Sequence, residues 1–320
     1  GKGPVFAGQE DRRLAEPRDH SHSPLQLVDE GAAGLGGKGE TPGQAGQGHG
    51  PDREFTLPPL ETGQTLHSLG RAVIVSLAAI FTTMSPRAQL AGSEPSTWRW
   101  SRSDASVALM RDDLTVWQFN YGPELNKPYF HPVATPDGQV LTWDQPPDHV
   151  WHHALWFSWK YINDVNYWEN NGQTGKPDGR TISSDVNVET HEDHSASISM
   201  AVAYQAAEDD RTVLREQRRI HVTAPTADGD YLMDWTATFH AMQQVKLDRT
   251  PPRAQSWGGY AGLSVRFAKE LSERQAIGLV GSATFDGGNR YRAADGAMDF
   301  NGLIDGSPVG LAILDHPQNP

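Results

Sequence analysis

The sequence predicts an all-β protein whose main part is a large two-sheet β-sandwich. Three observations favour this fold class. Apolar and polar residues alternate with period two in several segments beyond Ser93, Asp-Gly pairs separate these segments, and no long amphipathic helix with capping residues lies between them. Many short strands in one stretch are typical of two packed sheets rather than of a small barrel.

Three segments show the alternation most clearly, because apolar side chains two residues apart share one face of a strand. They are Ile198, Met200, Val202 and Tyr204; then Tyr231, Met233, Trp235 and Phe239; then Leu263, Val265 and Phe267. The residues between them are mostly polar or small. Each segment therefore predicts a half-buried strand.

Asp-Gly pairs predict the chain reversals between strands, since glycine readily adopts the positive φ that a tight turn requires. Asp228-Gly229 lies between strands expected at 212–223 and 231–240, which predicts a hairpin. Similar turns are expected at Asp137-Gly138, Asp178-Gly179, Asp286-Gly287 and Asp305-Gly306.

Composition divides the chain into three parts. Residues 1–70 are rich in Gly, Pro, Gln and charged residues and lack periodicity, which predicts a disordered tail. Residues 71–92 contain a short apolar run followed by small residues, which is typical of a secretory signal peptide cleaved near Ala91. A short buried helix is the alternative for this run. Residues 93–320 are then expected to form the sandwich domain. With a signal peptide, the protein is expected to be exported to the periplasm or the extracellular space.

Charge and composition narrow the choice of partners. A formal net charge of -13 argues against binding to nucleic acid, which requires a basic surface. The absence of Cys excludes disulfides, thiolate catalysis and Cys-based zinc sites. No run of about 20 apolar residues occurs, so no membrane span is predicted. A small-molecule or saccharide substrate is expected, and the oligomeric state is left open.

Segment 146–159 holds the densest group of chemically versatile side chains. It contains Asp148, His149, His152 and His153 together with Trp151, Trp156 and Trp159. Imidazole and carboxylate groups are costly to bury without partners, so core packing alone does not explain this composition. The segment is therefore the first candidate for a functional site.

Three interpretations of the segment are open. His149, His152 and His153 could bind a divalent metal, although adjacent His residues on a strand point to opposite faces, so that two of them at most would share an ion. They could instead act with Asp148 as general acids or bases while the Trp rings stack on a sugar. The third interpretation is structural: the imidazoles bond to a loop backbone and the Trp rings fill the core. No other cofactor is predicted.

Basic residues mark two further strands. In segment 215–219, Arg215, Gln217 and Arg219 share one face and Glu216 and Arg218 the other, and a solvated face with cross-strand pairs is expected. In segment 257–266, Arg266 points away from the apolar face of its strand. There it either holds an anionic or polyhydroxyl ligand or pairs with an acid.

An apolar strand expected at 309–314 leads directly into Asp315, His316 and Asn319. Polar residues at the end of a rigid strand are well placed to line a site, so this group predicts its second wall, although the same residues also suit a turn. There is no Gly-rich phosphate loop and no Gly-x-Ser-x-Gly motif, which argues against phosphoryl transfer and serine hydrolysis.

Three blocks, at 128–157, 259–266 and 310–320, together resemble the PmoA-like family of bacterial proteins, which is often labelled methane oxygenase PmoA. The most specific part is Asp148-His149-Val150-Trp151-His152-His153-Ala154-Leu155-Trp156. The resemblance covers roughly residues 98 to 320. It implies a soluble, galactose-mutarotase-like β-supersandwich and, by analogy, carbohydrate chemistry. Because relatives continue beyond the last block, the chain is expected to be truncated at its C-terminal end.

The expected function is binding or processing of a carbohydrate or sugar derivative at a His/Asp/Arg site. Catalytic candidates are His149, His152, His153, Asp148, Arg266, Asp315 and His316; substrate-binding candidates are Trp151, Trp156, Tyr260 and Asn319. The alternatives are a non-catalytic carbohydrate-binding or scaffold protein and a metal-dependent oxygenase. The shared-site hypothesis requires that His152 and Arg266 lie on the same side of the sandwich.

Overall fold

The structure is a computed structural model that describes residues 65–74, 97–206, 209–250, 261–278, 281–282, 284–285, 291–292, 297–316 and 319. Every regular element in this part of the chain is a β-strand, and every strand pairing within it is antiparallel. The all-β prediction is therefore confirmed. No helix in the described ranges has the length and apolar character needed to cross a bilayer.

The larger sheet has nine strands in the order β16-β15-β19-β20-β1-β12-β11-β10-β9. Their bounds are β16 Gly281–Ser282, β15 Ser272–Gly278, β19 Ala297–Ile304, β20 Ser307–Asp315, β1 Thr65–Ile74, β12 Tyr231–Ala241, β11 Thr212–Val222, β10 Ala196–Ala206 and β9 Gly179–Thr190. Strands β9 to β12 form a meander in which each strand pairs with the next in sequence.

The second sheet has six strands in the order β14-β6-β5-β4-β3-β2. Their bounds are β14 Gly262–Val265, β6 Leu155–Ser158, β5 Tyr129–Val133, β4 Leu114–Asn120, β3 Ser106–Arg111 and β2 Trp98–Arg102. Two small sheets complete the described strands: β13 (Leu247–Asp248) with β7 (Tyr161–Ile162) and β8 (Val165–Asn166), and β17 (Thr284–Phe285) with β18 (Tyr291–Arg292).

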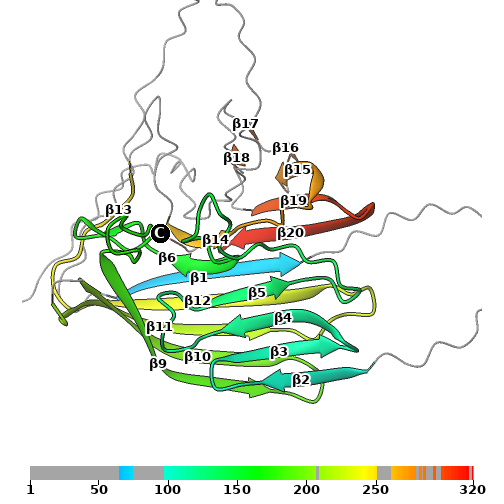
Figure 1. Ribbon diagram of the computed structural model, residues 1–320, viewed down its shortest axis with the longest axis horizontal. Coiled ribbons are helices and arrows are strands. Elements are labelled where there is room, and N and C mark those ends of the chain that lie inside the picture. The colour runs from blue at the N-terminus through cyan, green and yellow to red at the C-terminus, as the bar shows by residue number, and fades with distance from the viewer. Residues whose placement is uncertain are drawn as a thin grey trace, which may run out of the picture.

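The two large sheets pack face to face, and Figure 1 shows them overlaid. Their inner faces share one hydrophobic core. Phe130 of β5 meets Trp235 of β12 at a ring-centroid distance of 6.2 Å, and Phe157 of β6 meets Phe239 of β12 at 5.8 Å. The burial of such large aromatic rings is the main source of stability at this interface.

Most predicted strands and turns are found where the alternation and the Asp-Gly pairs placed them, although β14 is buried on both faces rather than half-buried. β10 and β12 bury every second residue. Gly229, at φ 92°, lies in the turn between β11 and β12, and Gly306, at φ 78°, lies in the turn between β19 and β20. Gly138 also turns at positive φ, but Gly179 is the first residue of β9 and is not a positive-φ turn glycine, so the turn expected at Asp178-Gly179 is wrong. Asp286-Gly287 lies outside the described residues.

Strand β1 covers the border between the expected tail and the expected export signal. It pairs with β12 over its whole length and with β20 from Gly70 to Val73. Residues 65–70, expected to be disordered, and residues 71–74, expected in the signal core, are therefore part of the large sheet. The rest of the expected tail and signal peptide lies outside the described residues, and export remains a prediction.

Strand β11 corrects the expectation of a solvated charged face. Arg215, Gln217 and Arg219 are exposed, as expected, but Glu216 and Arg218 are fully buried between the sheets. Arg218 Nε donates to Glu216 Oε1 at 2.5 Å and Tyr204 donates its hydroxyl to Glu216 Oε2 at 2.5 Å. A buried charge persists only when it is paired, and this ion pair meets that condition.

Candidate functional site

The candidate site lies on the face of the six-stranded sheet that points away from the nine-stranded sheet. Across this face, Ser264 of β14 is opposite Trp156 of β6, and Trp156 is opposite Tyr129 of β5. The neighbours Leu263 and Val265 point into the core instead. An outer sheet face is usually solvated, yet Ser264 and Trp156 are both 0% exposed. His152 from segment 134–154 and Trp168 from segment 159–178 pack against Trp156 on this face.

The His-rich segment is a pair of turns rather than a strand. His149 N donates to Pro146 O, and His152 N donates to His149 O, each at 2.9 Å. Gln145 N then donates to His152 O at 2.8 Å, and this bond joins the residue before the two turns to the residue after them. Because of this geometry, His149 and His152 lie on the same side, and their rings stack at 4.7 Å.

Asp148 joins the loop to β14. Its Oδ2 accepts hydrogen bonds from Arg266 Nη2 at 2.8 Å and interacts with His149 Nδ1 at 3.0 Å. Burial opposes ionisation of Asp148, but the hydrogen bonds from His149 and Arg266 and the charge of Arg266 outweigh it and lower the pKa of the carboxyl. We call Asp148, His149, His152 and Arg266 the Asp148 cluster.

His152 is the buried centre of this cluster. It is 1% exposed, and its ring packs between His149 and Trp156, whose centroid is 5.1 Å away. Burial, together with the nearby charges of His149, Arg266 and Lys127, lowers the pKa of His152 to about 2. His152 is therefore neutral near neutral pH, which does not suit the predicted role of general acid or base.

Several polar atoms around His152 are buried without a hydrogen-bond partner. They are both ring nitrogens of His152, Trp156 Nε1, Ser264 Oγ and Arg266 Nη1. Buried polar groups are nearly always paired in folded proteins, so unpaired groups gathered on one sheet face favour a binding partner from outside the chain. This group of atoms is the strongest indication of a binding site in the described chain.

His153 belongs to a second cluster on the same sheet face. Its Nδ1 lies 3.0 Å from Asp144 Oδ1, and Tyr129 donates its hydroxyl to Asp144 Oδ2 at 3.2 Å. Burial, with the charge and hydrogen bond of Asp144, raises the pKa of Tyr129 well above its usual value. His131 Nδ1 lies 3.1 Å from Thr142 Oγ1 nearby, and burial lowers its pKa.

Asp144 and Tyr129 were not identified from the sequence, because their roles depend on a bridge between Asp144 and His153 that closes the loop. The expectation that His152 and His153 point to opposite faces assumed a strand, which the segment does not form: His152 packs on Trp156 and His153 on Tyr129, and these two rings are cross-strand partners on one sheet face. Each now has its own polar partners: His152 in the Asp148 cluster and His153 with Asp144 and Tyr129.

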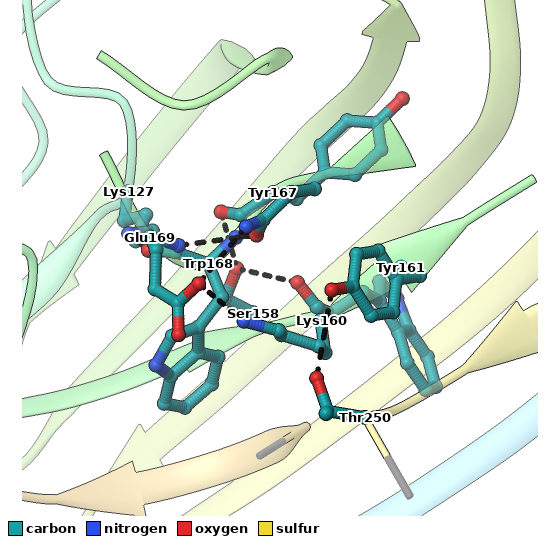
Figure 2. Close-up of polar contacts among 10 residues, drawn as sticks. Lys127, Ser158, Lys160, Tyr161, Tyr167, Trp168, Glu169 and Thr250 are labelled. Atoms are coloured by element: carbon teal, nitrogen blue, oxygen red, sulfur yellow. Dashed lines mark hydrogen bonds and ion pairs between the residues drawn. The ribbon is translucent and has the colours of Figure 1, made fainter. Parts of the chain in front are cut away.

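Lys127 is a further buried group, and it was not among the candidates predicted from the sequence. Its Nζ donates to Trp168 O at 2.6 Å and to Trp151 O at 3.3 Å, which ties the two covering loops together. Burial lowers the pKa of Lys127 to about 7, while Glu169 raises it and Lys160 lowers it. Figure 2 shows this region, in which Lys160 pairs with Glu169 at 2.5 Å.

The remaining candidates are distributed as follows. Trp151 is half-buried, with its ring 5.2 Å from that of His149. Trp156 is fully buried between His152 and Trp168, so it supports the cluster from below and presents no surface for a ligand to stack on. Tyr260 lies outside the described residues.

Asp315, His316 and Asn319 lie at the carboxyl end of β20 in the nine-stranded sheet, where Asn319 Nδ2 donates to Asp315 Oδ1. The hydrogen bonds of the Asp148 cluster join the loop to β14 in the other sheet. Within the described residues, no group of three or more His, Cys, Asp or Glu side chains is arranged to hold a metal ion. The geometry thus gives the metal-dependent interpretation no support.

Comparison with known families places the site inside a recognised domain. A family model described as a family of unknown function, DUF6807, matches residues 106–320, which include both polar clusters. No curated protein matches the chain. No solved structure matches it either.

Proposed function

The chain belongs to DUF6807, a family of unknown function, and we propose that it binds a carbohydrate or sugar derivative at the Asp148 cluster and processes it there. The observation that carries the proposal is the group of buried, unpartnered polar atoms around His152. Sugar hydroxyls both donate and accept hydrogen bonds, so one ring can satisfy several such atoms at once.

The surroundings of the cluster also suit a sugar. Asp148 and His149 are the accessible members, with side chains 45% and 24% exposed, and Trp151 adds an aromatic surface beside them. Apolar walls with a few convergent polar groups are the usual composition of a small-molecule site. The motif resemblance to PmoA-like proteins, with their mutarotase-type sandwich, favours the same ligand class by analogy.

Two His-Asp pairs supply the groups for acid-base chemistry. In the His149–Asp148 and His153–Asp144 pairs, the carboxylate holds the Nδ1 edge of the imidazole at 3.0 Å, and an imidazole oriented in this way can exchange protons with a ligand near neutral pH. His152 serves a different purpose: as a neutral ring it donates one hydrogen bond and accepts another. Processing therefore depends on His149 and His153, and binding on His152 and Arg266.

A thermal-shift screen of the protein against monosaccharides and oligosaccharides tests the proposal. A ligand at a hundredfold excess over its Kd stabilises the fold by about 2.7 kcal/mol, which raises the Tm of a domain of this size by about 5 to 11 °C. The double variant Asp148→Ala/His149→Ala should lose this shift, whereas the matched surface variant Asp193→Ala/His191→Ala should keep it. No stabilisation by any saccharide would contradict the proposal.

A further inference from the structure

Arg266 uses only one edge of its guanidinium. Nη2 donates to Asp148 at 2.8 Å, but Nη1 is buried and has no hydrogen-bond partner. The side chain is 4% exposed, its guanidinium lies over the Trp143 ring with Cζ 5.7 Å from the centroid, and the backbone N of Arg266 donates to Ala154 O at 2.6 Å. A buried donor on a charged group is costly to leave unpaired, so this edge favours an incoming acceptor.

The unpaired atoms on the same face of the sheet are mostly donors as well. Trp156 Nε1 can only donate, and Ser264 Oγ, which shares the outer face of the sheet with Trp156, donates through its hydroxyl. Neutral His152 adds one further donor. The ligand group that fits this place is therefore rich in acceptor oxygens.

The charges around the cluster favour an anion with a single negative charge. Arg266 is balanced by Asp148, and Lys160 is balanced by Glu169. Lys127, in contrast, is buried with two backbone carbonyls as its hydrogen-bond partners. Lys127 and Arg266 both lie close enough to His152 for their charges to act on it. Burial lowers the pKa of Lys127 to about 7, and a bound anion would favour its protonated form; a carboxylate would offset that charge, whereas a dianionic phosphate would exceed it.

We propose that the ligand is an acidic saccharide, a sugar ring that carries a carboxylate, and that Arg266 Nη1 receives this carboxylate while Asp148 and His149 contact the ring. The inference rests on the proposed function, since it names the class of sugar that the same site takes. Arg266 is then the residue that determines specificity.

Titration calorimetry with the full chain tests the inference. The probes are D-glucuronate, D-galacturonate and their short oligomers, the matched neutral sugars glucose and galactose, the 6-phosphates of these sugars, and acetate. A hydrogen bond to a charged group corresponds to about ten- to hundredfold in affinity, so uronates should bind tighter than the neutral sugars by that factor. Arg266→Gln should remove most of the difference, and Arg266→Lys should restore part of it.

Each outcome decides between the two proposals. If neutral sugars bind as tightly as uronates, the carboxylate inference is wrong and the proposed function stands. If the 6-phosphates bind tightest, the inference that the site favours a single negative charge is wrong. If acetate binds as tightly as the uronates, or if no sugar binds, the saccharide proposal fails as well. Arg99→Gln, an exposed arginine on β2, is the matched control. Should Arg266→Gln not fold, the ranking of probes on the unaltered protein decides alone.

Discussion

The guanidinium of Arg266 donates a 2.8 Å hydrogen bond to the carboxylate of Asp148, although the two residues are 118 positions apart in the chain. This contact fixes the His-rich loop to β14. The contact also joins a partly exposed carboxylate to a buried guanidinium: the side chain of Asp148 is 45% exposed and that of Arg266 is 4% exposed. Three predictions concern this contact and the buried residues His152 and Lys127, and a fourth concerns the ion pair between Glu216 and Arg218 that is buried between the sheets.

Arg266→Gln should raise the pKa of Asp148, because burial raises this pKa and the charge and hydrogen bond of Arg266, which help the hydrogen bond from His149 to lower it, would be lost. The folded pKa of Asp148 is lowered, so the stabilisation by this pair is present above the unfolded value of 3.8 and is lost as the pH falls through the folded pKa. Carboxyl-detected NMR titration measures the change. An unaltered Asp148 pKa in the variant, with Arg99→Gln as control, would show that the pair does not form.

His152→Leu should stabilise the protein and weaken ligand binding. Leucine has a similar volume and leaves no ring nitrogen unpaired, so the free energy of unfolding at pH 7 should rise by on the order of 1 kcal/mol. The pH dependence should also change. The folded pKa is about 2 and the unfolded value 6.5, so the unfolded state holds the proton between them and the wild-type protein loses stability as the pH falls through this window.

Urea unfolding between pH 4 and pH 7 checks this second prediction. His152→Leu should show a weaker loss of stability with acidification than the wild type, and the exposed variant His191→Leu should follow the wild type. If the variant is less stable at pH 7, the packing of the His152 ring contributes more to stability than its unpaired nitrogens cost.

Lys127→Met should abolish a rise of stability with pH on the alkaline side. Burial lowers the folded pKa of Lys127 to about 7, against 10.5 when unfolded, with Glu169 raising the folded value and Lys160 lowering it. Between these values the unfolded state binds the additional proton, so the free energy of unfolding increases with pH by at most about 1.4 kcal/mol per pH unit. Denaturation curves from pH 7 to pH 9.5 measure the slope.

The difference in slope between the wild type and Lys127→Met isolates this residue from other groups that titrate in the same range. The exposed variant Lys176→Met should retain the wild-type slope. Equal slopes in all three proteins would be inconsistent with a lowered pKa of Lys127.

Glu216→Gln should destabilise the protein strongly, because it leaves the buried guanidinium of Arg218 without a countercharge between the sheets. Removing one partner of a buried ion pair costs about 3 to 5 kcal/mol. Glu216→Leu/Arg218→Met, which removes both charges, should recover much of this loss. Chemical denaturation measures both, with Glu189→Gln on the exposed face of β9 as control. A loss below 1 kcal/mol for Glu216→Gln would contradict the buried pair.

The sequence alone determined the features that depend on local geometry. Side chains two residues apart share a face, so alternation identified the strands that became β10 and β12. Asp-Gly pairs identified the turns at Gly229 and Gly306, because glycine readily adopts the positive φ that these turns have. The unusual density of His and Trp identified the loop that carries the Asp148 cluster, because imidazole groups are costly to bury without hydrogen-bond partners.

The tertiary structure decided which faces are covered and which distant residues meet. Alternation placed Ser264 and Arg218 on faces of their strands but could not show that a loop covers the first and the opposite sheet covers the second. In the same way, the pairing of Asp144 with His153 requires the loop to close on itself, and that of Asp148 with Arg266 requires the loop to pack on β14. These contacts depend on packing between segments far apart in the chain, and no local pattern in the sequence encodes them.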